Sequence, residues 1–184
     1  AHVRAELGSG SGLHLADRAL AEGSVAIVLP FSWREDGELR EGVLKALKPG
    51  LAQRLGEELA ILPALGDFLV RRGAQLGLPA LDYHDHLAAA GRLLTHEIRL
   101  DREQAHMRAA AALLADDAHV FVPALLPWCT PSLTAMERIH GPKLADAALA
   151  PHEARRLGRA LVGGLLARPF WSPAESALFH GDLH

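Results

Sequence analysis

Phe179-His180-Gly181-Asp182-Leu183-His184 is the stretch that decides the fold, and it is the last stretch of the 184-residue sequence. It places one aspartate between two histidines, directly after an apolar residue. Such a pattern can be a metal-binding cluster or a polar junction between a strand and a loop. It can also be a catalytic loop in which the aspartate faces a reacting hydroxyl group.

His-x-Asp-x-His after an apolar residue is typical of the catalytic loop of kinase-like phosphotransferases. In that loop the Asp, here Asp182, faces the hydroxyl group of the phosphoryl acceptor. An Asn a few residues later and an Asp-Phe-Gly-type Asp further on hold the metal, and the sequence ends before either. We therefore expect no metal ligands within this chain, and we expect His180 and His184 to orient the loop.

The composition is that of a globular protein, with 49% hydrophobic and 22% charged residues. The formal net charge is -3 and no basic block is present, which argues against nucleic acid as a partner. The single cysteine, Cys129, cannot form an internal disulfide and fits a reducing compartment. No signal-peptide pattern and no uninterrupted apolar stretch of about 18 residues occurs, so we expect a cytoplasmic protein.

The first quarter of the chain predicts strands. Residues 13–16 alternate weakly between apolar and polar, residues 24–31 are apolar and rich in β-forming residues, and residues 43–47 form a third apolar run. An Asp-Gly pair, Asp36-Gly37, lies between the last two runs and predicts a hairpin. Lys48-Pro49-Gly50 ends the last strand, because Pro and Gly interrupt regular structure.

Helical periodicity dominates the rest of the chain. Pro63 lies inside the first helical stretch and should kink it or divide it. The expected elements are a helix from about Leu51 to Gln75, a second from about His84 to Leu114, strands at His119–Val122 and Leu133–Glu137, and a third helix from Pro151 to Pro169. The sequence therefore predicts an α+β fold.

This order matches a protein-kinase-like small lobe, an antiparallel sheet plus long helices, over residues 1–140. Residues 141–184 would then begin the helical large lobe and end in the catalytic loop. Such an enzyme needs a Lys on a strand to contact the nucleotide phosphates and a Glu on a following helix to hold that Lys. Lys45 occupies the position of the Lys in a V-A-I-K motif. Its alternative interpretation is a lysine that protects a strand edge from pairing.

The sequence resembles the UbiB/AarF-type atypical kinases, a family linked to isoprenoid quinone biosynthesis. The Val-Ala-Val-Lys-Val-x-Arg-Pro-Gly strand of that family is similar to Val43–Gly50, and its Pro-Gly pair is rare in ordinary protein kinases. Further similar segments follow in the family's order, namely Glu57–Leu62, Glu97–Arg99, Glu103–His106, Val122-Pro123, Leu133–Gly141 and Phe179–His184.

The resemblance implies a role for particular residues. Lys45 would contact phosphates, Glu103 would form an ion pair with Lys45, and Asp182 would be the catalytic-loop Asp. Met136 and Glu137 would fall at the hinge, where backbone groups hydrogen-bond adenine. For Glu103 an alternative is a local pair with the residue four positions earlier, Arg99.

The sequence departs from the family at the Ala-rich segment that lies over the phosphates. Residues 21–28 keep Ser24, which could still approach phosphate. Ile27 stands where the family has Gln, so we expect one polar contact beside the phosphates to be lost. The upstream Lys-x-Gly-Gln segment is absent, Arg99 stands at an acidic position and His106 replaces an Asn. These departures predict a divergent member of the family.

By this resemblance the expected cofactors are ATP and Mg²⁺, with most metal ligands beyond His184. The expected partners are a nucleotide and a small-molecule or lipid-like acceptor, and peripheral membrane association is compatible with them. The 184-residue chain alone is expected to be inactive. Two alternatives remain, an aminoglycoside or choline phosphotransferase relative and a non-catalytic nucleotide-binding or interaction module. Lys48-Pro49-Gly50 and the helical insertion argue against the first, whereas the altered Ala-rich segment favours the second.

Two further expectations concern geometry and a polar cluster. The Lys45 ammonium and the Glu103 carboxylate should lie within salt-bridge reach. Residues 24–28 should turn from a loop into a strand and face a cavity bordered by Lys45 and Asp182. The segment Asp82-Tyr83-His84-Asp85-His86 contains metal-ligand residue types, but its place at a predicted helix start favours capping by the Asp.

Overall fold

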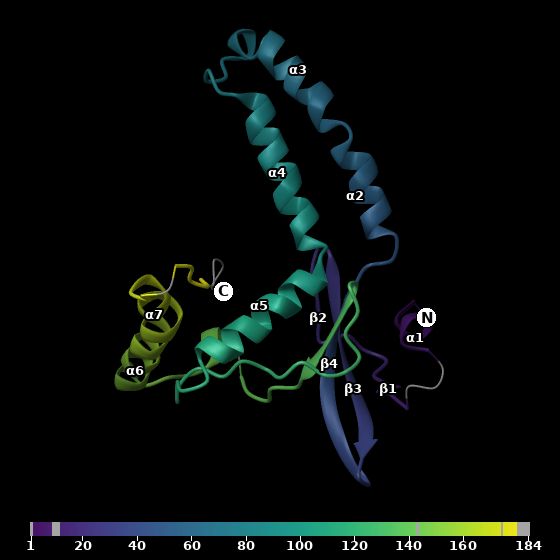
Figure 1. Cartoon of the computed structure of the whole chain (residues 1–184), viewed down its shortest axis with the longest axis vertical. Coiled ribbons are helices and arrows are strands. Elements are labelled where there is room, and N and C mark those ends of the chain that lie inside the picture. The colour runs from purple at the N-terminus through teal and green to yellow at the C-terminus, as the bar shows by residue number, and fades with distance from the viewer. Residues whose placement is uncertain (1, 9–11, 143, 174, 180–184) are drawn as a thin grey trace.

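The computed structural model describes residues 2–8, 12–142, 144–173 and 175–179. The predicted catalytic loop at 180–184, including Asp182, lies outside the described residues. An antiparallel sheet forms one end of the structure, a helical arm projects from it, and further helices extend to the other side (Figure 1).

The sheet contains five strands in the described part of the chain, β1 (His14–Leu15), β2 (Ala21–Glu22), β3 (Ala26–Glu35), β4 (Glu38–Leu47) and β5 (Leu133–Glu137). Their order is β1-β3-β4-β5, with β2 also paired to β3, and every pairing is antiparallel. Asp36 and Gly37, with φ of 51° and 83°, form the turn between β3 and β4. Both positive angles suit a two-residue hairpin turn, so the predicted hairpin is confirmed.

The strand predicted at His119–Val122 is wrong. These residues belong to no strand, and only Leu125 nearby forms an isolated bridge, with Met136. Val120, Phe121 and Val122 line a cavity, which accounts for their apolar character without a strand. Pro123 follows them and has no N–H group to donate to a neighbouring strand.

The arm is an antiparallel pair of helical segments. One side contains α2 (Leu51–Leu59), α3 (Leu62–Arg72) and the short η1 (Ala74–Leu76), and the other is α4 (Tyr83–Glu97). The predicted first helix divides just before Pro63, which lies in the first turn of α3, where its missing N–H is tolerated. A Cβ built on Gly66 of α3 would lie 2.6 Å from Nδ1 of His84 in α4, so the glycine permits the close approach of the two helices.

The second predicted helix also divides, into α4 and α5 (Leu100–Leu113). Arg99 has non-helical angles, φ -104° and ψ 81°, and precedes α5 as its N-cap residue. The break lets Leu100 become buried, with 1% exposure, against Ala26 and Leu47, and Ile98 packs on the same cluster. The gain from burying these apolar side chains on the sheet outweighs the helix periodicity that continues through this region.

The opposite face of the sheet contains the larger core cluster. Phe31, Leu44, Leu133 and Ala135 are buried there together with Val3 of the N-terminal helix α1 (His2–Leu7). Trp33 stacks on Phe31 and Trp128 meets it edge to face, with ring centroids 5.4 and 5.6 Å from that of Phe31. The hydroxyl groups of Thr130 and Ser132 both donate to Glu6, which fastens α1 beside β5.

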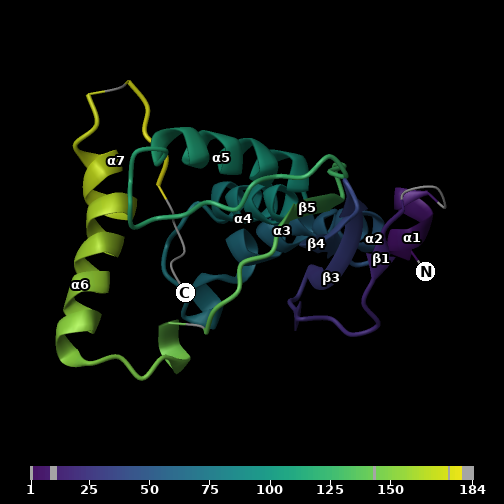
Figure 2. The ribbon, with the colours of Figure 1, turned by 90° about the horizontal axis from the view of Figure 1, so that it is seen from below.

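The last helical unit lies beyond the end of α5 that is distant from the sheet (Figure 2). It contains the short η2 (Leu144–Asp146), then α6 (Pro151–Leu161), the π-helical turn η3 (Val162–Ala167) and α7 (Arg168–Phe170). Pro169 was expected to end this helix, but α7 runs one residue beyond it because Pro169 lies in its first turn. Within the described ranges, no helix is both long and apolar enough to cross a bilayer. The structure confirms the predicted α+β class, an antiparallel sheet with long helices.

Candidate active site

Lys45 of β4 and Glu103 of α5 form an ion pair, although 58 residues separate them in the sequence. The lysine Nζ lies 2.6 Å from Oε2 of the glutamate, and the two side chains are 30% and 35% exposed. The prediction that the two groups lie within salt-bridge distance is confirmed. The alternative partner for Glu103 is wrong, because Arg99 binds both carboxylate oxygens of Asp101, at 2.8 and 2.7 Å.

Strand alternation places the lysine on the face of the sheet that α5 covers. Side chains alternate between the two faces of a strand, so Lys45 shares its face with Leu47, which packs against Leu100 of α5. Leu44 and Ala46 point to the other face, into the larger core cluster. The ion pair thus lies beside an apolar contact that joins the strand to the helix.

Gln104 fixes the rotation of α5 about its own axis. This residue was not predicted from the sequence. Its side chain is 5% exposed, and its Nε2 donates to the carbonyl oxygens of Thr130, at 2.8 Å, and Leu133, at 3.1 Å. The hydroxyl of Thr134 lies 3.1 Å from the same nitrogen. Because Gln104 binds the beginning of β5, the preceding Glu103 is directed toward Lys45. A polar residue four positions after the buried Leu100, on the same helix face, was the signal that could have revealed it.

At the start of α5, Arg99 and Asp101 form a second charged pair, between neighbouring residues of the chain. The hydrogen bond from Arg99 lowers the pKa of the Asp101 carboxyl, and Asp101 in turn raises the pKa of the Arg99 guanidinium. Asp101 lies in the first turn of α5, where a negative charge interacts favourably with the helix dipole. This pairing occupies Arg99 and leaves the Glu103 carboxylate to Lys45.

An apolar strip lies on the same face of the sheet as Lys45. Register places Val28 and Thr134 on either side of Lys45, and Pro30 and Met136 on either side of Val43. Val28, Val43 and Met136 are half-buried, so their side chains are only partly covered. Glu137 ends β5, where its N–H donates to the carbonyl of Ala124 at 2.9 Å.

Ser24 is exposed in the turn between β2 and β3. Two contacts with Lys48 hold this turn, since the Lys48 N–H donates to the Val25 carbonyl at 2.9 Å and its ammonium lies 2.8 Å from Glu22. The hydrogen bond from Lys48 lowers the pKa of Glu22. The expected turn from loop to strand is therefore present, whereas its relation to Asp182 lies outside the described residues.

Ile27 changes the interpretation of the altered Ala-rich segment. It pairs with Ala46 and packs against the core cluster on the face opposite Lys45. Its side chain therefore points away from the face that carries Lys45. An isoleucine at this position does not change the polar groups on the Lys45 face. The expectation that Ile27 costs a polar contact beside the phosphates is not supported by this placement.

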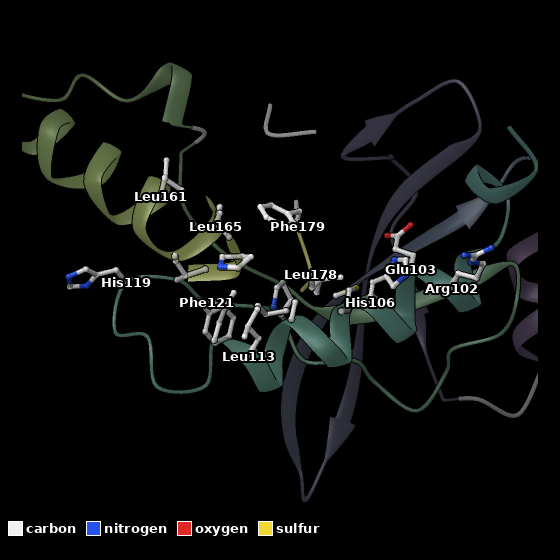
Figure 3. Close-up of a pocket in the computed structure, with 18 of the residues that line it drawn as sticks. Arg102, Glu103, His106, Leu113, His119, Phe121, Leu161, Leu165, Leu178 and Phe179 are labelled. Atoms are coloured by element: carbon white, nitrogen blue, oxygen red, sulfur yellow. The ribbon is translucent and has the colours of Figure 1, made fainter. Parts of the chain in front are cut away.

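A cavity of about 840 Å³ opens beside the ion pair, between α5, residues 119–123 and the last helical unit. Figure 3 shows Arg102, Glu103 and His106 at one end and Phe121, Leu161 and Leu165 toward the other. Phe179, which directly precedes the predicted catalytic loop, lines the same cavity as Glu103. The cavity thus has a polar end at the ion pair and an apolar end beneath α6.

The polar segment 82–86 has a structural role at the start of α4. Asp82 caps the helix by accepting from the N–H of Asp85 at 3.0 Å, as expected. His84 lies 3.3 Å from Asp67 of α3 and so joins the two sides of the arm. Across the residues that the structure describes, no three His, Cys, Asp or Glu side chains converge as a metal site.

An antiparallel sheet whose lysine is held by a glutamate from the neighbouring helix is the arrangement of a protein-kinase-like small lobe. The chain belongs to the ABC1 atypical kinase-like domain family, whose match covers residues 13–184. It is 28% identical over 167 residues to a protein named probable protein kinase UbiB from Pseudomonas fluorescens (strain SBW25). That similarity covers 90% of this chain and 30% of the relative, so the chain spans less than a third of its length. The predicted resemblance to UbiB/AarF-type kinases is confirmed.

Proposed function

We propose that this chain forms the ATP-binding part of an atypical kinase that hydrolyses ATP or transfers its γ-phosphoryl group. The Lys45–Glu103 ion pair, at 2.6 Å, carries the proposal. In kinases a lysine held in this way contacts the nucleotide phosphates, and the glutamate keeps its ammonium in position. The 58-residue separation makes a local helix or hairpin pair an inadequate explanation.

The strip beside Lys45 suggests how the nucleotide would lie. Val28, Val43 and Met136 would pack against the adenine ring, and backbone groups near Met136 and Glu137 would hydrogen-bond its edge. The triphosphate would then extend along β4 toward Lys45, with the Ser24 turn above it. An apolar surface with few polar groups at its edge suits a flat heterocycle.

Asp182 would orient the acceptor hydroxyl and take its proton as the phosphoryl group is transferred. Mg²⁺, when bound, would neutralise charge on the β- and γ-phosphates. The described residues show no cluster of metal ligands, so we assign none of them to the metal. Lys45 and the backbone of the Ser24 turn would supply this chain's own contribution, which is to position the phosphates.

The acceptor that we propose is a small molecule or a lipid-like molecule. The cavity beside Glu103 supports this class, because it joins polar side chains such as Arg102 and His106 to an apolar end with Phe121 and Leu165. An amphipathic acceptor could place its hydroxyl at the polar end. A role in isoprenoid quinone biosynthesis follows from the family resemblance and would provide such acceptors.

Nucleotide titration of Lys45→Met tests the proposal. A fluorescent ATP analogue should bind the wild-type chain, and the substitution should weaken binding at least about tenfold, because a hydrogen bond to a charged group is worth roughly 1.5–3 kcal/mol. Arg40→Met is the matched control, since Arg40 lies on the same strand with its charge paired to Glu38 at 3.0 Å. Equal affinity of Lys45→Met and the wild type would contradict the nucleotide site.

A further inference from the structure

The helix α6 presents a basic face that the proposed nucleotide site does not use. His152, Arg155, Arg156 and Arg159 recur at intervals of three and four residues, so they lie on one side of the helix. All four are exposed and line a cavity of about 590 Å³. Gly163 and Gly164, which follow α6 directly, also line it, as do Asp117 and His119 from an earlier segment. We call this space the α6 cavity.

Among the residues that the structure describes, the three arginines of this face have no protein partner. Within the described ranges, no hydrogen bond or ion pair joins the guanidinium groups of Arg155, Arg156 and Arg159 to another side chain or carbonyl. Other arginines are paired, as in the contacts Arg99–Asp101, Arg138–Glu41 and Arg168–Asp116.

The α6 cavity has an excess of positive charge. Its three guanidinium groups face one carboxylate, that of Asp117, whose Oδ1 already accepts from the His119 N–H at 2.8 Å. Like charges three or four residues apart on a helix repel one another. An anion in the cavity would relieve this repulsion.

At the α6 cavity, the backbone at Gly164 allows the segment that contains Asp117 and His119 to lie close to the helix. Gly164 is buried, and a Cβ built on it would lie 2.9 Å from Val120 Cγ2 and 3.1 Å from Asp117 Oδ2. The absence of a side chain therefore lets the segment with Asp117 and His119 close against the helix. The π-helical turn η3 (Val162–Ala167) lies at the same place, and such turns occur often at functional sites.

We propose that the α6 cavity binds a phosphate group, separately from the phosphates of the nucleotide. Guanidinium groups match phosphate oxygens with paired, charge-assisted hydrogen bonds, and the ring N–H groups of His119 and His152 can add donors. His119 and Gly164 line both this cavity and the cavity beside Glu103, so they form a wall common to both. Figure 3 shows His119 at the end of the larger cavity away from Glu103.

The phosphate can belong to a soluble phosphoester or to a phospholipid headgroup, and two probes separate these sources. Inorganic pyrophosphate is titrated calorimetrically into the protein, and the protein is mixed with phosphatidylcholine vesicles with or without phosphatidylglycerol. Arg155→Ala/Arg159→Ala should weaken pyrophosphate binding at least about tenfold. Arg71→Ala/Arg92→Ala, which removes the same charge from the exposed surface of the arm, should change it less than about twofold.

Lys45→Met separates this site from the nucleotide site, because pyrophosphate binding at the α6 cavity should survive that substitution. Phenylglyoxal labelling with mass spectrometry locates binding without a variant, since pyrophosphate should protect Arg155, Arg156 and Arg159 but leave Arg71 reactive. Binding of phosphatidylglycerol vesicles without pyrophosphate binding, lost in the α6 variant, would assign the phosphate to a lipid. Absence of both kinds of binding, or equal loss in the α6 and arm variants, would overturn the proposal.

Discussion

The two cationic sites of the molecule differ in what balances their charge. Lys45 lies 2.6 Å from a carboxylate that another element supplies, and Gln104 holds that element in place. The arginines of α6 lie side by side on one helix, facing a cavity with a single carboxylate. We call the Lys45 site balanced, because a carboxylate neutralises its charge and holds the ammonium in a fixed position before any ligand binds. We call the α6 site unbalanced, because its positive charges exceed the negative charge near them and therefore attract an anion. The first arrangement suits positioning in catalysis, and the second suits binding.

The largest effect should come from the residue that fixes the balanced site. Gln104→Leu keeps the size of the side chain but removes the donor to the part-buried Thr130 carbonyl and to the buried Thr134 hydroxyl. We expect a loss of about 2–3 kcal/mol in the free energy of unfolding, measured by urea denaturation, together with weaker nucleotide binding. Gln53→Leu, on the exposed surface of α2, should change stability by less than about 0.5 kcal/mol. A loss no larger than that of the Gln53 control would show that Gln104 does not hold α5.

Removing the balancing charge should affect binding more than stability. Glu103→Gln keeps the shape of the side chain but weakens its hold on the Lys45 ammonium. We expect nucleotide affinity to fall about three- to tenfold in a fluorescence titration. The free energy of unfolding should change by less than about 1 kcal/mol, because both side chains are about one-third exposed and solvent screens the pair. Glu57→Gln on α2 is the control, and equal affinity of both variants would contradict the role of Glu103.

The unbalanced site should respond in the opposite direction. Without phosphate, Arg155→Gln removes a like-charge neighbour of Arg159 and should raise the free energy of unfolding by about 0.2–0.5 kcal/mol. Arg168→Gln should not stabilise the protein, because Arg168 pairs with Asp116 and lowers the pKa of that carboxyl. Thermal unfolding at low ionic strength measures both. If the free energy of unfolding changed in the same direction in both variants, paired and unpaired arginines would not differ as we propose.

The smallest effect should be the pH dependence of the Glu22–Lys48 pair. Lys48 lowers the pKa of Glu22 in the folded protein, so the pair stabilises the fold above the ordinary glutamate pKa. This contribution is lost as pH falls through the lowered folded value. The difference in thermal stability between the wild type and Glu22→Gln should therefore be largest near neutral pH and disappear in acid. A difference that grows as pH falls would show that the sign is wrong.

The sequence predicted the site better than the boundaries of the helices. Lys45 was identified because a kinase-type site needs a lysine on a strand, and Glu103 because the resemblance to the family implies a pair between them. Asp36-Gly37 was identified because a hairpin turn requires positive φ angles. Each of these needs one residue type at one place, so a short pattern reveals it.

Features that depend on packing between distant segments were missed. The break at Arg99 depends on burial of Leu100 against the sheet, which helix periodicity does not report. The apolar run at Val120–Val122 lines a cavity instead of pairing in a strand, and periodicity does not distinguish these. The role of Gln104 depends on carbonyl groups 26 and 29 residues away.

The arm also affects how the ion pair can form during folding. Lys45 and Glu103 close a loop of 58 residues, and closing a flexible chain of that length costs on the order of 3–4 kcal/mol in entropy. The arm occupies most of this loop, and its two sides are packed on each other through contacts such as Gly66 with His84 and Gly91 with Leu62. A helical hairpin forms from local contacts and so folds early and fast. Once it has formed, the strand and the helix at its base are already neighbours, so Lys45 and Glu103 have only a short distance left to search.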